Sequence, residues 1–136
     1  MESDVVVIGA GPGGSASAIA LRRRGFRVAV LEKSFMPRGK VCGEMVAPLG
    51  VRELERLGVL PRIERAGAGR VNRVVFYSPG GARSEIPFPR GEYGIGMSRE
   101  RLDTILFEEA RELGALGNEG LRDENVGRDG GTGRIL

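Results

Sequence analysis

The order of apolar and polar residues near the start of the chain indicates a strand, a helix and a second strand. Residues 4–8 form a mostly β-branched run, typical of a strand buried on both faces of a parallel sheet. Residues 13–24 place small residues before helix formers, and Gly25 follows as a stop signal. Residues 26–31 indicate a second strand that ends at Glu32. A β-α-β unit of about 30 residues predicts a right-handed crossover between parallel strands.

The pattern changes several times in the middle of the chain. Residues 33–46 are rich in turn formers and charges, so we expect a loop there. Residues 48–60 predict a short helix headed by a proline. Residues 71–77 and 83–88 predict the two strands of an antiparallel hairpin. Apolar residues at helical spacing predict a further helix over residues 99–113. The expected fold class is α/β with a small antiparallel β insertion.

The last part of the chain has a different character. Six glycines fall in the last 22 residues, and the apolar residues among them show no sustained period. Polar, glycine-rich segments bury too little apolar surface to offset the entropy lost on ordering them. We therefore predict one domain over residues 1–115 and a disordered glycine-rich tail over residues 116–136.

Composition and charge narrow the classes of function. Of the 136 residues, 40% are hydrophobic and 29% charged, with 21 Lys and Arg against 18 Asp and Glu. So small a positive excess, with 5% aromatic residues, does not favour nucleic-acid binding. The absence of histidine excludes a Ser-His-Asp hydrolase, and a single cysteine, Cys42, gives no basis for a zinc site or an internal disulfide. We expect neither a metal nor a nucleic-acid partner.

Two features bear on location. The longest apolar stretch, near residues 5–8, is far shorter than the roughly 20 residues of a transmembrane helix. The first residues carry acidic side chains, where a secretory signal peptide carries positive charge. We expect a cytoplasmic protein with no transmembrane segment. The sequence carries no signal for the oligomeric state.

Residues 9–14 read GAGPGG, a G-x-G-x-x-G motif directly after the first predicted strand and at the start of the predicted helix. In such motifs Gly9 allows the tight turn, Gly11 lets the backbone approach a pyrophosphate, and Gly14 lets helix and strand pack closely. The phosphates would lie on the helix N-terminus, where free N–H groups and the helix dipole favour anions. Pro12 and Gly13 belong to the same turn.

Glu32 stands 23 residues after Gly9, at the carboxyl end of the second predicted strand. An acid at this place accepts hydrogen bonds from the hydroxyls of an adenosine ribose, and its charge disfavours a 2′-phosphate. Strand, glycines, helix and acid together predict a Rossmann-like dinucleotide-binding domain. The alternative is a glycine-rich turn in another α/β domain. NAD and FAD share the half that this motif recognises, so the motif does not decide between them.

Three segments resemble one family. Residues 4–33 resemble the N-terminus of FAD-dependent oxidoreductases of the para-hydroxybenzoate hydroxylase fold. Residues 38–44, followed by the proline-headed helix, resemble its geranylgeranyl reductase branch, which borders the flavin-dependent halogenases. Residues 96–106 resemble the arginine-headed helix that follows the inserted sheet in this family. The resemblance spans about residues 4–115 and implies a partial Rossmann-like FAD-binding domain.

The resemblance implies a cofactor site. It assigns the ADP half of FAD to the glycines of the turn, Glu32 and Lys33. It places Arg38, Cys42 and Gly43 on a loop that runs past the ribityl chain and flavin. Arg99 would contact the cofactor from the start of its helix. The planar guanidinium of an arginine can donate two parallel hydrogen bonds to pyrophosphate oxygens. The alternatives are a solvated cation for Arg99 and a small buried hydrophobic residue for Cys42.

The function implied is FAD-dependent oxidoreduction, with NADPH or NADH as a possible electron donor and a small isoprenoid or aromatic substrate. Members of this fold run to several hundred residues, so we expect a truncated or frameshifted reading frame beyond residue 115. Two alternatives stay open. One is an NAD-binding module without flavin; the other is a fragment with no activity of its own, left with an exposed strand edge that invites aggregation.

Overall fold

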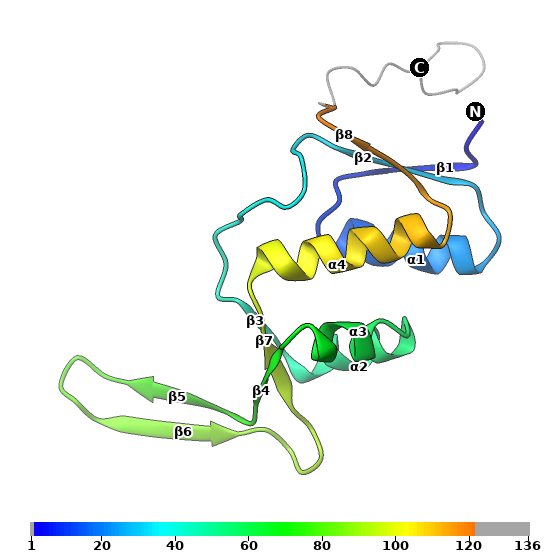
Figure 1. The fold of residues 1–136 in the computed structure, drawn as a ribbon. Coiled ribbons are helices and arrows are strands. Elements are labelled where there is room, and N and C mark those ends of the chain that lie inside the picture. The colour runs from blue at the N-terminus through cyan, green and yellow to red at the C-terminus, as the bar shows by residue number, and fades with distance from the viewer. Residues whose placement is uncertain (1, 122–136) are drawn as a thin grey trace. The chain divides into compact units, whose positions relative to one another are not determined.

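The computed structural model describes residues 2–121 and divides them into two compact units. The first unit contains the residues up to Gly39 and those from Glu100 onward, and the second contains Lys40–Arg99. Figure 1 follows the chain through both units. The fold class is α/β, with parallel strands in the first unit and antiparallel strands in the second, as predicted.

The first unit is built on a three-stranded parallel sheet in the order β1-β2-β8. Its elements are β1 (Val5–Ile8), α1 (Pro12–Arg23), β2 (Val28–Glu32), α4 (Arg99–Glu112) and β8 (Leu116–Glu119). The register pairs Val5 with Val28 and Ala29 with Leu116, so all three strands run in the same direction. The carboxyl ends of parallel strands meet at one edge of the sheet, where ligands bind in folds of this class.

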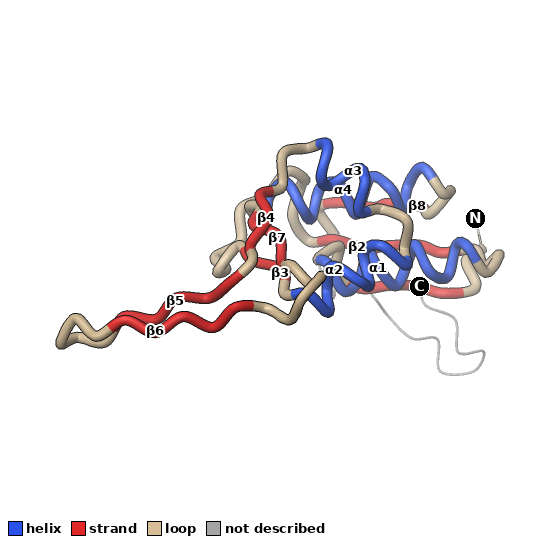
Figure 2. The backbone as a smooth tube through the Cα atoms, turned by 90° about the horizontal axis from the view of Figure 1, so that it is seen from below, coloured by secondary structure: helices blue, strands red, loops and turns tan. Residues whose placement is uncertain are grey.

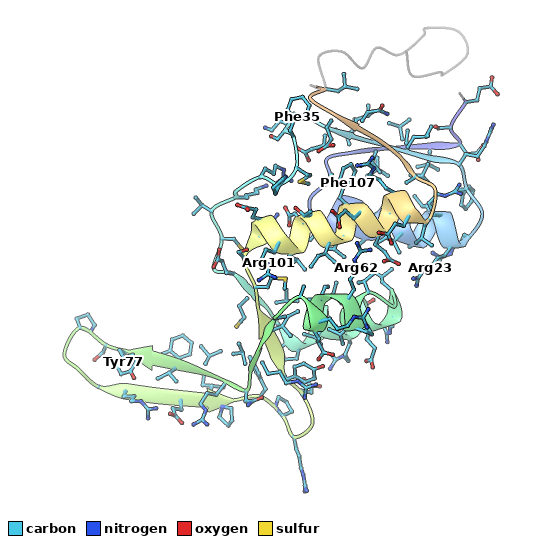
Figure 3. The ribbon with its side chains drawn as sticks, in the orientation of Figure 1. Arg23, Phe35, Arg62, Tyr77, Arg101 and Phe107 are labelled. Carbon is cyan, nitrogen blue, oxygen red and sulfur yellow. The ribbon has the colours of Figure 1, made fainter. Side chains whose placement is uncertain are left out.

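The helices of the first unit lie along one face of its sheet, as the two orientations in Figures 1 and 2 show. Ile19 of α1, Val30 of β2 and Leu106 of α4 are fully buried and form the centre of this core. Phe107 is also buried and points from α4 towards the sheet (Figure 3). Gly117 of β8 lies against the ring of Phe107. A Cβ atom at Gly117 would stand 2.7 Å from the Cζ of Phe107, so β8 approaches α4 closely.

The strand β8 corrects the sequence analysis, which expected no stable element after residue 115. Residues 116–119 alone would not predict a strand, because they include a glycine, an asparagine and a glutamate. The exposed edge of β2 supplies the missing stability, since its backbone groups pair with those of β8. The expectation of disorder was wrong for these four residues. Residues 122–136 lie outside the described residues.

The second unit contains a three-stranded antiparallel sheet in the order β3-β7-β4 and a separate hairpin, β5-β6. Its elements are β3 (Met45–Val46), α2 (Pro48–Arg56), α3 (Leu60–Arg65), β4 (Gly69–Val71), β5 (Arg73–Tyr77), β6 (Arg83–Pro87) and β7 (Gly94–Gly96). The hairpin confirms the predicted strands. The single helix predicted over residues 48–60 is instead two helices, because Gly58 adopts a φ of 63° between them.

The hairpin β5-β6 has two different faces. Arg73 and Arg83 both form ion pairs with Glu85 on one face. Phe76 and Ile86 lie on the other face and are 54% and 55% exposed. Figure 2 shows the hairpin extending away from the three-stranded sheet of its own unit, and Figure 3 shows Tyr77 near its tip.

Two features are absent from the described part of the chain, a helix that could span a membrane and a cluster of metal-ligating side chains. Within residues 2–121 no helix combines the length and the apolar character that crossing a bilayer requires. In the same residues no group of three or more Cys, Asp or Glu side chains could hold a metal ion.

The buried face of α4 gives a first testable prediction. Leu106→Ala should lower the free energy of unfolding by about 2–5 kcal/mol, because it leaves a cavity among fully packed side chains. Leu49→Ala is the matched control, since Leu49 is 62% exposed on α2. Urea unfolding followed by circular dichroism measures both. Equal stability of the two variants would show that Leu106 is not part of a packed core.

Candidate functional site

The glycine-rich turn between β1 and α1 is shaped by close packing of its backbone. Gly9 has a φ of 94°, a conformation that L side chains rarely adopt. A Cβ on Gly14 would stand 1.9 Å from the carbonyl oxygen of Gly9, so only glycine fits at that position. Helix α1 begins at Pro12, with Gly11 as its N-cap. The roles predicted for Gly9 and Gly14 in shaping this turn are confirmed.

The N-terminus of α1 is open to a ligand. Gly11 provides no side-chain cap, and the first turn contains no acidic residue, so the first backbone N–H groups keep their capacity to donate. Cβ atoms built on Gly9 and Gly13 would meet nothing within 4 Å. The turn therefore leaves free space beside a helix end that favours an anion.

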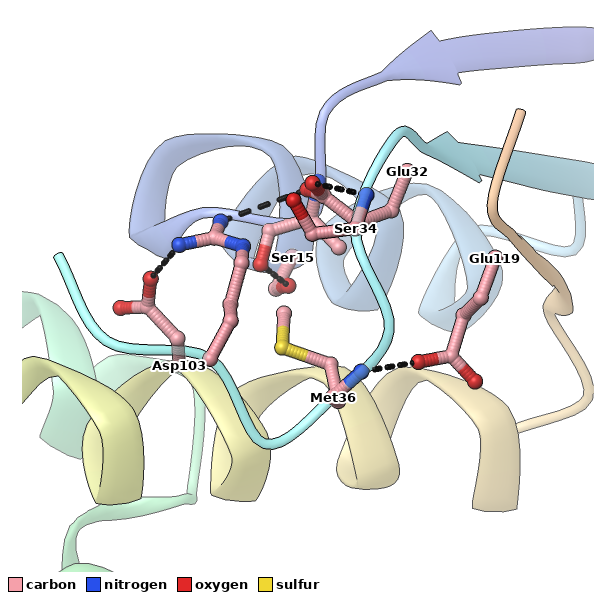
Figure 4. Close-up of polar contacts among 8 residues, drawn as sticks. Ser15, Glu32, Ser34, Met36, Asp103 and Glu119 are labelled. Atoms are coloured by element: carbon pink, nitrogen blue, oxygen red, sulfur yellow. Dashed lines mark hydrogen bonds and ion pairs between the residues drawn. The ribbon is translucent and has the colours of Figure 1, made fainter. Parts of the chain in front are cut away.

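Glu32 is the last residue of β2, and its side chain contacts the glycine-rich turn. Its Oε2 accepts a hydrogen bond from the Ala10 backbone N–H at 2.7 Å, and its Oε1 accepts one from the Ser34 N–H at 3.1 Å (Figure 4). The side chain is 4% exposed. The carboxylate thus lies against the glycine turn, at the end of β2.

The ionisation of Glu32 reflects two opposing effects. Burial alone raises the pKa of a carboxyl group, but hydrogen bonds from Ala10 and Ser34 and the guanidinium of Arg38 outweigh it, so the pKa of Glu32 lies below its ordinary value. Glu32 is therefore an acceptor at neutral pH. A carboxylate has about four acceptor positions, and three donors occupy three of them, which leaves capacity for a ligand hydroxyl.

Arg38 joins this site through two buried carboxylates. Its Nη2 lies 3.3 Å from Glu32 Oε2, and its Nη1 lies 3.1 Å from Oδ2 of Asp103 on α4. The buried Nε–H of Arg38 has no hydrogen-bond partner among the described residues. A buried donor without an acceptor is unfavourable, so a ligand oxygen at this position would be stabilised.

These features fit the adenosine diphosphate part of a dinucleotide. The open helix end and the space beside Gly9 and Gly13 suit a diphosphate, and the acceptor capacity of Glu32 suits a ribose hydroxyl. The unpartnered Nε–H of Arg38 offers one more donor at the same place.

The remaining predicted residues lie elsewhere. Lys33 is exposed beside Glu32. Cys42, Gly43 and Arg99 belong to the second unit, where they lie together. Cys42 is exposed rather than buried, and a backbone hydrogen bond from Glu44, followed by one from the Arg99 side chain, lowers the pKa of its thiol. The alternative of a buried hydrophobic cysteine is thus wrong.

The sequence analysis missed Asp103. Its position between apolar residues, directly after Leu102 and three residues before Leu106, was the available signal. An aspartate on the buried face of an amphipathic helix is unusual unless it has a partner. Asp103 is 0% exposed, and the partner is Arg38.

Comparison with known proteins identifies the class. The chain belongs to the family described as "FAD binding domain", whose model matches residues 2–132. The match continues past residue 115, where the resemblance noted in the sequence ends.

Individual relatives carry related descriptions. The chain is 35% identical over 136 residues to the menaquinone reductase of Mycolicibacterium smegmatis, and the match covers 98% of this chain and 32% of that protein. It is 38% identical over 116 residues to digeranylgeranylglycerophospholipid reductase 2 of Methanopyrus kandleri, covering 85% of this chain and 27% of that protein. The chain therefore spans about a third of these relatives or less.

A solved structure shows the same fold. The myxobacterial chondrochloren halogenase, an FAD-dependent halogenase, superposes with a TM-score of 0.80 at 28% identity. The superposition covers 98% of this chain and 34% of the halogenase chain. The described fold thus resembles about a third of that longer halogenase chain.

The two glycines of the helix start allow a paired test. Gly14→Ala should lower the free energy of unfolding by about 1–3 kcal/mol, because its Cβ overlaps the backbone of Gly9. Gly13→Ala should raise it by about 0.5–1 kcal/mol, because alanine favours the helix and meets nothing. Urea unfolding measures both variants. A tolerated Gly14→Ala would contradict the close approach.

Glu32 predicts a pH dependence of stability. Since its pKa is lower in the folded chain, Glu32 stabilises the fold above the unfolded glutamate pKa of about 4.3, and this contribution disappears as the pH falls through the folded value. The stability difference between wild type and Glu32→Gln should therefore shrink as the pH falls from 7 to 3. Urea unfolding at each pH measures it. Glu53→Gln, which removes an exposed ion pair with Arg56, is the control. A constant Glu32→Gln difference at all pH values would refute the linkage.

Proposed function

We propose that this chain binds FAD through its adenosine diphosphate half and serves as the FAD-binding part of an FAD-dependent oxidoreductase. The observation that carries this proposal is the buried Glu32 carboxylate, 2.7 Å from the Ala10 backbone N–H, beside a helix N-terminus without a side-chain cap. Membership of the FAD-binding family supports it.

Each predicted residue takes a part in this proposal. The N-terminus of α1, with Gly11, Pro12 and Gly13, holds the pyrophosphate, while Gly9 and Gly14 shape the turn. Glu32 accepts a hydrogen bond from the adenosine ribose, and Lys33 adds a solvent-facing cation beside it. We propose Arg38 for the ribose end, rather than for the ribityl chain and flavin to which the resemblance assigned it, because its guanidinium contacts Glu32.

Three residues of the second unit complete the proposed set. Cys42 and Gly43 lie on the loop after Gly39, and Arg99 starts α4. The Arg99 side chain donates to the Cys42 thiol, so these groups form one polar cluster. We assign this cluster to the flavin side of the cofactor.

The proposed reaction is a redox reaction of an apolar small molecule. Bound flavin supplies hydride transfer, while the protein supplies position, electrostatics and exclusion of water. Two relatives are named as reductases of a menaquinone and of a digeranylgeranylglycerophospholipid, so we propose an isoprenoid substrate. NADPH or NADH is the proposed electron donor. The cytoplasmic location stays a prediction.

Cofactor binding tests the proposal directly. The chain contains no tryptophan, so quenching of flavin fluorescence on titration reports binding without interference from tryptophan. We expect FAD to bind and ADP to displace it, and we expect FMN, which lacks the adenosine monophosphate part of FAD, not to bind. Glu32→Gln should weaken FAD binding about tenfold, the effect of losing one charge-assisted hydrogen bond. Glu53→Gln, on the surface of α2, should bind FAD as the wild type does.

Three outcomes would overturn the proposal. Failure of the folded chain to bind FAD would do so, and so would FMN binding as tight as FAD binding, since the ADP half would then not be recognised. Binding of NAD in preference to FAD would favour the NAD-binding module instead.

A further inference from the structure

One member of the buried charge cluster has no part in the proposed FAD site. Asp103 projects from α4, is 0% exposed, and accepts a hydrogen bond at 3.1 Å from Nη1 of Arg38. The same guanidinium reaches Glu32 through Nη2 at 3.3 Å. Arg38 therefore bridges a carboxylate at the end of β2 and a carboxylate on α4 (Figure 4).

The charges of the cluster bear on which ribose fits. The side chains of Glu32, Asp103 and Arg38, counted alone, carry a formal charge of −1, and the two carboxylates are 4% and 0% exposed. In dinucleotide sites, an arginine beside the acid accommodates a ribose 2′-phosphate. Here the guanidinium is already engaged by two carboxylates, so it offers no net positive charge to such a phosphate.

The geometry of the guanidinium depends on Asp103. Arginine is planar, and its donors point in fixed directions, so a contact at Nη1 determines where Nη2 and Nε lie. With Asp103 on Nη1 and Glu32 on Nη2, the buried Nε–H remains without an acceptor. A neutral hydroxyl or ether oxygen of a ribose would satisfy it without adding a second negative charge.

We propose that Asp103 is a positioning residue that acts through Arg38: it holds the guanidinium on Glu32, so that the site accepts a ribose with a free 2′-hydroxyl and rejects a 2′-phosphate. The inference rests on the proposed function, because it places an adenosine diphosphate beside Glu32. It goes beyond that function by assigning ribose selectivity to a residue on a helix distant in sequence from the glycine motif.

The experiment compares ADP-ribose with its ester that carries a phosphate on the 2′-oxygen of the adenosine ribose. Titration calorimetry on the full chain measures the binding of both ligands. The wild type should prefer ADP-ribose. Asp103→Asn should reduce this preference about tenfold, because it releases the Arg38 guanidinium from its fixed position and lets it turn towards the phosphate. Glu109→Gln removes the same charge from the same helix, where Glu109 lies 3.6 Å from Arg23, and should keep the wild-type preference.

A double variant separates positioning from a structural role. In an Arg38→Met background, Asp103→Asn should leave the ligand preference unchanged, since the residue through which it acts is absent. A purely structural role would lower the melting temperature without changing the preference. If Asp103→Asn changes the preference equally with and without Arg38, the proposal is overturned.

Arg38→Lys keeps the proposal testable if Asp103→Asn does not fold. A lysine ammonium retains the charge but lacks the fork that contacts both carboxylates, so the preference should fall as in Asp103→Asn. A wild-type preference in Arg38→Lys would overturn the inference.

Failure of the inference and failure of the proposed function give different results. A folded wild-type chain that binds neither ADP-ribose nor FAD contradicts both. A wild type that prefers ADP-ribose, with an Asp103→Asn variant that behaves like Glu109→Gln, contradicts the inference alone.

Discussion

The hydrogen bond from the Ala10 N–H to the Glu32 carboxylate fixes the arrangement on which the site depends. Ala10 is 0% exposed, so its N–H would be buried without a partner if Glu32 did not accept from it. Glu32 in turn needs hydrogen-bond donors, because burying an unpaired carboxylate costs a large desolvation free energy. The contact therefore ties the end of β2 to the glycine turn after β1. It also places a negative charge beside the open end of α1.

The same requirement extends the cluster to α4. The buried carboxylate of Asp103 also needs a cation or hydrogen-bond donors. The planar guanidinium of Arg38 forms an ion pair with both Asp103 and Glu32. The end of β2 and the loop directly after it thus meet the distant helix α4 in one charge network. This network fixes orientation, because the planar guanidinium of Arg38 contacts both carboxylates at the same time.

Prediction from sequence succeeded where a local pattern carried the information. The β-branched run of β1, the glycine turn and the amphipathic α4 each have a period or a backbone requirement visible within a few residues. β8 could not be predicted this way, because Gly117 and Asn118 have no strand preference and the strand forms only on the edge of β2. The contact between Asp103 and Arg38 joins residues 65 positions apart, which no local period reports.

Strand β8 also contributes a side chain that holds the loop carrying Arg38. Its last residue, Glu119, accepts a hydrogen bond at 2.5 Å from the Met36 N–H, while Glu32 accepts one from the Ser34 N–H (Figure 4). Carboxylates at the ends of two adjacent parallel strands therefore hold one loop at two points, and that loop carries Arg38. Since strand ends converge at one edge of a parallel sheet, adding β8 beside β2 is what allows Glu119 to reach the loop. The pairing of β8 with the edge of β2 thus helps to determine where the guanidinium meets Glu32.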